Sequence, residues 1–196
     1  MDAIYRDLQT RGYRLIAGTD EVGMGCLAGP VVASVVILDP LNVPAGIKDS
    51  KLLSPAKREE LSPLIQAAAV AYAFGWAEVD EIDTINIFQA ARLAMKRALE
   101  KLVPLPDFLL VDGRAKVDTA VPQQSLIRGD RISVSIGAAS VLAKVYRDRW
   151  MARLDEKYPG WGFAQHKGYG SVLHRTQLAR LGQSSIHRKS FSWTPV

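Results

Sequence analysis

The pattern of apolar positions along the chain predicts buried strands early in the sequence. Short runs of β-branched and aliphatic residues occupy Leu15 to Asp20 and Val31 to Leu38, with Gly and Pro residues between them. Such runs are typical of buried strands joined by a tight connection. The same reasoning predicts a later strand at Asp107 to Asp112 and a short one near Gln124 to Ile127.

The segment from Val70 to Val79 has a two-sided pattern. Large residues alternate there with small ones, namely Val70, Tyr72, Phe74 and Trp76 with Ala71, Ala73, Gly75 and Ala77. Since successive side chains of a strand point to opposite faces, this pattern predicts a strand with one bulky and one small face. We expect helices to pack closely on the small face.

Four segments carry helical signals. Ser54-Pro55 begins the first, from Pro55 to about Ala69, because serine can cap free N–H groups and proline fits the first helical position. Apolar residues at helical spacing predict long helices over 87–102, ending before Pro104, and over 136–154. A last helix is predicted over 171–181.

The order of these elements predicts an α/β fold with a mixed sheet, including a crossover between the strands at 70–79 and 107–112. The three early strands are compatible with antiparallel pairing. No repeat, low-complexity tract or Gly/Ser linker divides the sequence, so we expect one domain over residues 1–196. Residues from about 157 to 196 are expected to form a C-terminal extension of it.

Composition narrows the class of protein. The chain has 196 residues, of which 48% are apolar and 23% charged, as in an ordinary soluble domain. The single cysteine, Cys26, excludes a disulfide framework and a thiolate zinc site. The acidic and basic residues near the N-terminus do not resemble a signal peptide, and the apolar runs are too short to span a bilayer. We therefore expect a cytoplasmic protein with no membrane contact.

Charge is distributed unevenly along the chain. The net charge is +5, which permits binding to a polyanion. From Lys157 to Val196 there are six Lys or Arg, all three His and six of the fifteen aromatic residues, but no Asp or Glu. This segment is a candidate anion-binding face.

Acidic residues follow two of the predicted strands. Asp20 ends the first strand and Asp112 a later one, each before a glycine-containing turn, with Glu21 beside Asp20 and Asp130 in a loop before a long helix. If the strands are parallel neighbours, the carboxylates face one crevice and need a cation to offset their repulsion. Oxygen ligands favour Mg²⁺ or Mn²⁺. The alternative is four ordinary acids at strand ends and turns.

Several segments resemble blocks of the ribonuclease HII family, the type 2 ribonucleases H, over roughly residues 14 to 191. In chain order they are Asp20-Glu21-Val22-Gly23-Met24-Gly25, Leu27-Ala28-Gly29-Pro30-Val31-Val32, Lys48-Asp49-Ser50-Lys51-Leu52-Leu53-Ser54, Val111-Asp112-Gly113, Gly129-Asp130, Ala138-Ala139-Ser140-Val141-Leu142-Ala143-Lys144-Val145-Tyr146-Arg147-Asp148 and His166-Lys167-Gly168-Tyr169-Gly170. The resemblance implies a ribonuclease H-like fold, with a mixed five-stranded sheet flanked by helices and a helical C-terminal extension.

The resemblance also implies an activity. The family is an endonuclease that hydrolyses the RNA strand of RNA–DNA hybrids, including single ribonucleotides embedded in duplex DNA, and leaves 3′-hydroxyl and 5′-phosphate ends. Its four catalytic acids map to Asp20, Glu21, Asp112 and Asp130. They are expected to hold two Mg²⁺ or Mn²⁺ ions that clamp the scissile phosphate. Asp148, four residues after Lys144, is the competing candidate for the fourth acid; its alternative is a helix-surface ion pair.

Candidate substrate contacts come from the same blocks. The resemblance assigns junction recognition to Tyr169, whose flanking glycines leave little to bury its ring. Phosphate contacts are expected from four basic residues, and reading of the 2′-hydroxyl from the backbone of a glycine-rich loop. These residues are Lys51, Lys144, Lys167 and Arg188 for the phosphates, and Gly23, Met24 and Gly25 for the loop. We expect a monomer that binds the hybrid or ribonucleotide-containing duplex.

The chain departs from the family at one position: Met24 stands where the family usually has an arginine between two glycines. This removes a guanidinium able to hold phosphate, so we expect weaker junction recognition. His166, His174 and His187 are interpreted as surface groups without a catalytic role, and Cys26 as a packing residue. Alternative functions are a different two-metal nuclease of the same fold and a non-catalytic hybrid-binding module.

Overall fold

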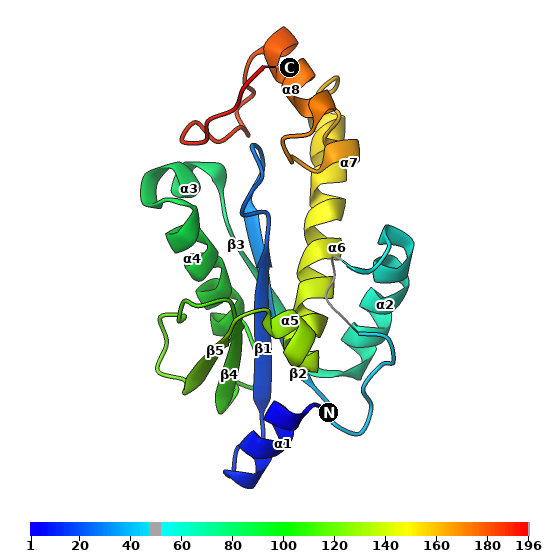
Figure 1. Cartoon of the computed structure of the whole chain (residues 1–196), viewed down its shortest axis with the longest axis vertical. Helices are drawn as coiled ribbons and strands as arrows, with labels where there is room; N and C mark the ends of the chain where they lie inside the picture. The colour runs from blue at the N-terminus through cyan, green and yellow to red at the C-terminus, as the bar shows by residue number, and fades with distance from the viewer. Residues whose placement is uncertain (48–51, 196) are drawn as a thin grey trace.

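The computed structural model describes residues 1–47 and 52–195. Its centre is a five-stranded sheet with helices on both faces, in the strand order β3-β2-β1-β4-β5 (Figure 1). The strands are β1 (Ile16–Val22), β2 (Val31–Leu38), β3 (Ala69–Ala77), β4 (Phe108–Asp112) and β5 (Gln123–Leu126). The predicted mixed sheet is confirmed, with each strand within two residues of its expected ends.

The strand directions follow from the connections. β1, β2 and β3 pair antiparallel in sequence order. β4 then pairs parallel with β1, and β5 parallel with β4. The chain therefore returns from the β3 edge across β2 and β1 before β4 begins, which is the predicted crossover. This return places the ends of β1 and β4 side by side.

The helices include the four predicted from periodicity: α2 (Pro55–Ala68), α4 (Ile87–Glu100), α6 (Val134–Lys157) and α8 (Val172–Leu181). Four shorter helices were not predicted: α1 (Ala3–Thr10), α3 (Val79–Ile85), α5 (Gly129–Ile132) and α7 (Phe163–His166). They span four to eight residues, too few for a repeating apolar pattern. Within the described ranges, no helix is long and apolar enough to cross a membrane.

Helix α4 packs on the small face of β3, as the alternation of residues predicts. A Cβ on Gly75 would overlap the carbonyl oxygen of Ala94, so the two backbones meet without an intervening side chain. Buried residues of β1, β2, β3 and α4, including Ala33, Ala73 and Ala98, form the largest core cluster. Small side chains therefore bring α4 close to the sheet.

Helix α6 crosses the opposite face. A Cβ on Gly18 of β1 would overlap the backbone of Ser135 and Ile136, so the start of α6 lies directly on the strand that carries Asp20. On the bulky face of β3, Phe74 stacks on Tyr146 of α6 with ring centroids 4.4 Å apart. Large aromatic residues thus fill the wider gap on this side.

The C-terminal extension folds over one end of the molecule. In Figure 1, α7, α8 and the last residues lie together at the far end of α6, next to the loop that joins β1 to β2. Met151 of α6, Trp161, Phe163 and Leu178 are buried in one cluster with Ala28 of that loop. The extension therefore contacts the β1–β2 loop directly.

Candidate active site

Asp20 and Asp112 lie at matching ends of two neighbouring strands. β1 and β4 are parallel, and the last paired residues in their register are Thr19 and Val111. Asp20 and Asp112 directly follow that pair in their strands. Adjacent strands are about 4.8 Å apart, so the two carboxylates share the carboxyl edge of the sheet. The structure thus brings together two predicted residues that are 92 positions apart.

Asp20 is a buried acid among other acids. Its side chain is 6% exposed, and its Oδ1 accepts a hydrogen bond from the Glu21 N–H at 2.8 Å. Burial raises the pKa of Asp20 well above its usual value; the nearby charges of Glu21 and Asp112 raise it further, against a hydrogen bond from Ser140 that lowers it. A divalent cation bound at this edge would offset the repulsion between these carboxylates.

Asp130 reaches the same region through the backbone. Arg128 has a left-handed conformation, with φ 57°, and α5 begins at the next residue. The Gly129 N–H donates to Asp112 Oδ1 at 2.6 Å, and a Cβ on Gly129 would lie 3.2 Å from that oxygen. Asp130 follows immediately and is 8% exposed. The turn therefore places Asp130 next to Gly129, whose N–H is hydrogen-bonded to Asp112.

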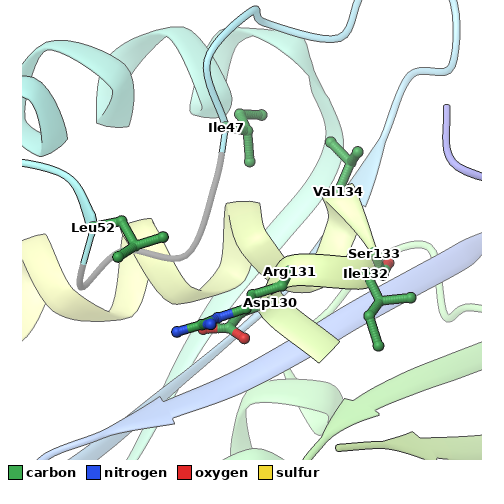
Figure 2. Close-up of a pocket in the computed structure, with 7 residues that line it drawn as sticks. All are labelled: Ile47, Leu52, Asp130, Arg131, Ile132, Ser133 and Val134. Carbon is green, nitrogen blue, oxygen red and sulfur yellow. The ribbon is translucent and has the colours of Figure 1, made fainter. Parts of the chain in front are cut away.

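Asp130 also lines a cavity of about 310 Å³ beside α5. Figure 2 shows Asp130 and Arg131 there, with Ile132, Ser133 and Val134 following and with Ile47 and Leu52 across the opening. Apart from Asp130 and Arg131, the lining is mostly aliphatic. Asp130 therefore borders this cavity even though the residue is buried.

The donor atoms of the acidic cluster are all carboxylate oxygens, which suits Mg²⁺ or Mn²⁺. Among residues 1–47 and 52–195, no three His, Cys, Asp or Glu side chains stand in an arrangement that could hold a metal ion as they are. Mg²⁺ commonly takes only one or two carboxylates and completes its shell with water and substrate phosphate. Asp20 and Asp112 at one sheet edge fit such a site.

Asp148 has a different partner. Its carboxylate accepts from Lys144 Nζ at 2.7 Å, in an i, i+4 pair on α6 whose side chains are both less than 20% exposed. Asp148 therefore forms an ion pair with Lys144, which was the alternative to its role as the fourth acid. The pair also holds the Lys144 ammonium 5.4 Å from the centroid of the Tyr169 ring.

Gly23, Met24 and Gly25 form the turn after β1. Gly23 is buried with φ 100°, and a Cβ there would overlap the Arg147 guanidinium, so only glycine fits. Gly25 is exposed, and the side chain of Met24 is half-buried against the core under α4. The turn therefore presents Gly25 to solvent while Gly23 anchors it.

A buried guanidinium group holds this loop from below. Arg147 is fully buried and donates to the carbonyl oxygens of Ala28, Pro30 and Lys167 at 2.8–3.1 Å. These bonds turn three carbonyl groups inward, from the β1–β2 loop and from the turn before Tyr169. Arg147 thus joins two segments that are predicted to meet substrate.

Arg188 has a structural position instead of the predicted phosphate contact. It is 1% exposed, and its guanidinium donates to the carbonyl oxygens of Met24 and Gly29 at 2.9–3.1 Å. Burial, together with the charge of Arg147, lowers the pKa of Arg188 to about 10. A phosphate cannot reach a side chain covered in this way, so Arg188 positions the Gly23–Gly25 turn.

Tyr169 lies beside the same turn. Its backbone forms an isolated bridge with Cys26, and its side chain is 39% exposed. Burial of the hydroxyl end raises the pKa of Tyr169 to about 12. The ring therefore has a solvent-facing part and an anchored part, next to the exposed Gly25.

The two remaining predicted lysines differ in what the structure shows. Lys167 is half-buried with φ 53°, and its ammonium donates to the Ala164 carbonyl oxygen at 2.6 Å. Lys51 lies outside the described residues. Lys167 therefore sits two residues before Tyr169 in the same turn, with its charge directed to the backbone.

The histidines are not surface groups, which corrects the prediction made for them. His174 is fully buried, His187 is 2% exposed and His166 is 8% exposed. The rings of His166 and His174 stack with centroids 4.0 Å apart. The sequence shows three histidines in a basic segment, but their packing depends on contacts between α7, α8 and the residues after α8.

One group of residues at the site was not predicted. A cavity of about 290 Å³ is lined by the acids Glu21 and Asp112 and by the apolar residues Met24 and Phe88. Phe88 is 70% exposed at the start of α4. The remaining lining residues are Ala91, Arg92, Met95, Gly113, Arg114 and Ala115. The available signal was Phe88 itself, an aromatic residue in the first turn of the helix and outside the apolar positions that predicted it.

The chain is similar to known proteins over most of its length. The family model described as Ribonuclease HII matches residues 17–194. The chain is 54% identical to Ribonuclease HII of Geobacter sulfurreducens over 92% of this chain and 83% of that protein. It is 51% identical to Ribonuclease HII of Syntrophotalea carbinolica over 94% of this chain and 88% of that protein.

Solved structures agree with the sequence comparisons. The ribonuclease H2 of Pyrococcus horikoshii OT3 superposes with a TM-score of 0.75 at 26% identity, covering 91% of this chain and 94% of that one. The ribonuclease HII from a PCNA complex of Archaeoglobus fulgidus superposes with a TM-score of 0.78 at 25% identity, covering 93% and 98%. The chain therefore belongs to the ribonuclease HII family, the type 2 ribonuclease H endonucleases that act on RNA–DNA hybrids.

Proposed function

We propose that this endonuclease cuts the RNA strand of hybrids, including single ribonucleotides in duplex DNA, with two Mg²⁺ or Mn²⁺ ions held by Asp20, Glu21, Asp112 and Asp130. The observation that carries the proposal is the parallel register of β1 and β4, which sets a buried Asp20 beside Asp112. Burying like charges together is unfavourable unless a cation joins them. A divalent cation between these two carboxylates would offset that unfavourable burial, which supports the proposal.

Divalent ions at these carboxylates would supply Lewis acidity, activating water and stabilising the leaving 3′ oxygen of the RNA. The chain's own part is to hold the carboxylates. Ser140 and the Glu21 N–H hydrogen-bond Asp20, and the Gly129 N–H fixes Asp112. A solved ribonuclease HIII structure of the same fold contains Mn²⁺, which supports this choice of ion.

Substrate binding is proposed along the surface between the acids and Tyr169. The exposed Gly25 offers backbone groups to a 2′-hydroxyl, which distinguishes RNA from DNA. The exposed part of the Tyr169 ring would stack on a sugar or base, with Lys144 beside it for a phosphate. Lys167 and Lys51 are proposed as further phosphate contacts. We also propose that the chain acts in the cytoplasm as a monomer formed by a single domain.

A cleavage panel tests the substrate class and the metal together. Labelled duplexes with all-RNA, one ribonucleotide or no ribonucleotide in one strand are incubated with no metal, Mg²⁺ or Mn²⁺. We expect cutting only where RNA is present and only with metal, with 5′-phosphate ends. Cutting of the all-DNA duplex would favour another nuclease of the same fold, and binding without cutting in every metal would favour a hybrid-binding module.

Replacing the acids one at a time tests their roles. Asp20→Asn, Asp112→Asn and Asp130→Asn should each lower kcat by more than about a hundredfold, since each removes part of a charge that holds the ions. Asp148→Asn should lower kcat much less, because Asp148 is paired with Lys144. Glu100→Gln, at an exposed position on α4, is the matched control for loss of a carboxylate. Equal losses in Asp130→Asn and Glu100→Gln would exclude Asp130 from the site.

A further inference from the structure

The three histidines form a buried cluster whose hydrogen bonds can be followed atom by atom. At one end, the backbone N–H of Ser184 donates to His187 Nδ1 at 2.8 Å. At the other end, His174 Nδ1 lies 3.0 Å from the Tyr169 carbonyl oxygen. Between them, the Nε2 atoms of His174 and His187 are 3.0 Å apart. The chain of contacts runs from the C-terminal segment to the backbone of Tyr169.

The two ends fix the direction of every bond. A backbone N–H only donates, so His187 Nδ1 is an acceptor and its proton is on Nε2. A carbonyl oxygen only accepts, so His174 carries its proton on Nδ1. His187 Nε2–H then donates to the bare Nε2 of His174. Both rings are neutral, and each has one defined tautomer.

His166 is assigned in the same way. Its Nδ1 accepts from the Gly168 N–H at 3.1 Å, so its Nε2–H donates to the Trp161 carbonyl oxygen at 2.8 Å. The ring is neutral and stacks nearly parallel on His174, at an interplanar angle of 10°. His166 thus packs against one face of the His174 ring and hydrogen-bonds the turn that precedes Tyr169.

The chain of imidazoles is anchored on residues 184–188, which we call the C-terminal strap. The strap pairs with the β1–β2 loop: the Gly29 N–H donates to the Ile186 carbonyl oxygen and the Arg188 N–H to the Leu27 carbonyl oxygen, both at 2.9 Å. His187 itself forms an isolated bridge with Ala28. The strap is therefore hydrogen-bonded to the loop that carries Gly23–Gly25, and His174 links it to Tyr169.

We propose that His174 is a positioning residue for substrate recognition: through its Nδ1–H it holds the Tyr169 carbonyl to the C-terminal strap, which sets the Tyr169 ring against the Gly23–Gly25 turn. The proposal rests on the proposed role of Tyr169 at the substrate. In this proposal, α8 and the strap determine the position of Tyr169 at the binding surface. His174 itself does not contact the substrate. The effect is attributed to one part-buried hydrogen bond, which the Tyr169 carbonyl accepts in addition to the one from the Ser171 N–H.

Two conservative variants separate the contacts of His174. In His174→Asn the short amide can donate at the position of Nδ1 and keep the Tyr169 carbonyl paired. In His174→Gln the longer amide reaches the position of Nε2 and meets His187, so the Tyr169 carbonyl loses the bond from His174 and keeps only the one from the Ser171 N–H at 2.8 Å. For a duplex with one ribonucleotide, we expect His174→Gln to raise KM by about tenfold with kcat little changed. His174→Asn should stay within about threefold of the wild type.

A double-mutant cycle with Tyr169→Ala distinguishes positioning from general loss of structure. If His174 acts through Tyr169, then His174→Gln adds no further rise in KM to Tyr169→Ala. Val172→Ala, at an exposed position on α8, is the matched control and should leave KM unchanged. Effects of His174→Gln and Tyr169→Ala that multiply, or equal KM values for the Asn and Gln variants, would overturn the proposal.

Nitrogen NMR of the imidazole rings gives a readout that does not depend on activity. In the metal-free wild-type protein at pH 7, we expect His174 protonated on Nδ1 and His166 and His187 protonated on Nε2. Any other tautomer of His174, or a charged ring, would overturn the proposed chain. If the wild type cuts no RNA-containing duplex while these tautomers are found, the proposed function fails and the hydrogen-bond assignment stands.

Discussion

At the scale of single residues, the site combines residues fixed by hydrogen bonds with residues exposed to solvent. Asp20 is held by Ser140 and the Glu21 N–H, whereas Gly25 is exposed. Met24 lies in the turn between the metal-site acids and the exposed Gly25. Its carbonyl accepts from buried Arg188, and its side chain lies in the cavity shared with Phe88. The family's usual arginine is thus replaced by an apolar wall beside the acids.

Met24→Arg should restore an exposed cation at this wall. In an Asp20→Asn background, which prevents cutting, we expect affinity for a ribonucleotide-containing duplex to rise by about tenfold at low salt, since a charge-assisted hydrogen bond to phosphate is added. The slope of log K against log salt should steepen by about one. Fluorescence anisotropy across a salt series measures both. Met24→Leu is the apolar control, and a slope equal to that control would contradict the prediction.

At the scale of secondary-structure elements, close backbone contacts set where the acidic residues lie. α4 lies against β3 at Gly75, and α6 lies against β1 at Gly18. The sequence predicted the first contact from the alternation of large and small residues. It did not predict the second, because Gly18 lies in a short apolar run without a visible alternation.

Gly75→Ala should disturb the packing of α4 on the sheet. The added methyl overlaps backbone atoms of Ala94 and Ala98, which cannot move aside as a flexible side chain would. We expect the free energy of unfolding to fall by about 1–3 kcal/mol in urea titrations. Gly25→Ala is the stability control, because a Cβ there meets nothing within 4 Å. Equal stability of the two variants would show that α4 yields more easily than the contact implies.

At the scale of the whole molecule, buried histidines help to join the C-terminal extension to the β1–β2 loop, and they do so as neutral rings. Burial, together with the nearness of another imidazole ring, lowers the pKa of His174 and of His187 to about 4. Burial also lowers the pKa of His166, with the charge of Lys167 acting the same way and Asp155 opposing it. The extension therefore stays attached while these rings are neutral.

Acid should weaken this attachment. The unfolded chain binds protons on histidine near pH 6.5 and the folded chain near pH 4, so stability is lost as the pH falls between these values. At pH 4.5 the loss should reach about 2–3 kcal/mol for one such histidine. Urea titrations from pH 7 to 4.5 should show a smaller loss in His174→Asn, which lacks one titrating ring. Parallel curves for the two proteins would contradict the assignment.

Sequence periodicity alone determined most of the fold. The five strands and four longer helices follow from alternation, capping residues and apolar spacing, which are local properties of the chain. The resemblance to the ribonuclease HII family, and with it the choice of Asp20, Glu21, Asp112 and Asp130, also came from local blocks. α1, α3, α5 and α7 were missed because eight residues or fewer give no repeating pattern.

Only the tertiary structure decided which charged and polar groups are buried. Arg188 and the three histidines looked like surface groups of a basic segment, but the strap and α8 fold over the β1–β2 loop and enclose them. Burial and hydrogen-bond direction depend on neighbours far away in sequence, such as Ala28 for His187 and Met24 for Arg188. A local pattern contains the residue types, whereas their protonation and exposure are set by contacts that exist only after folding.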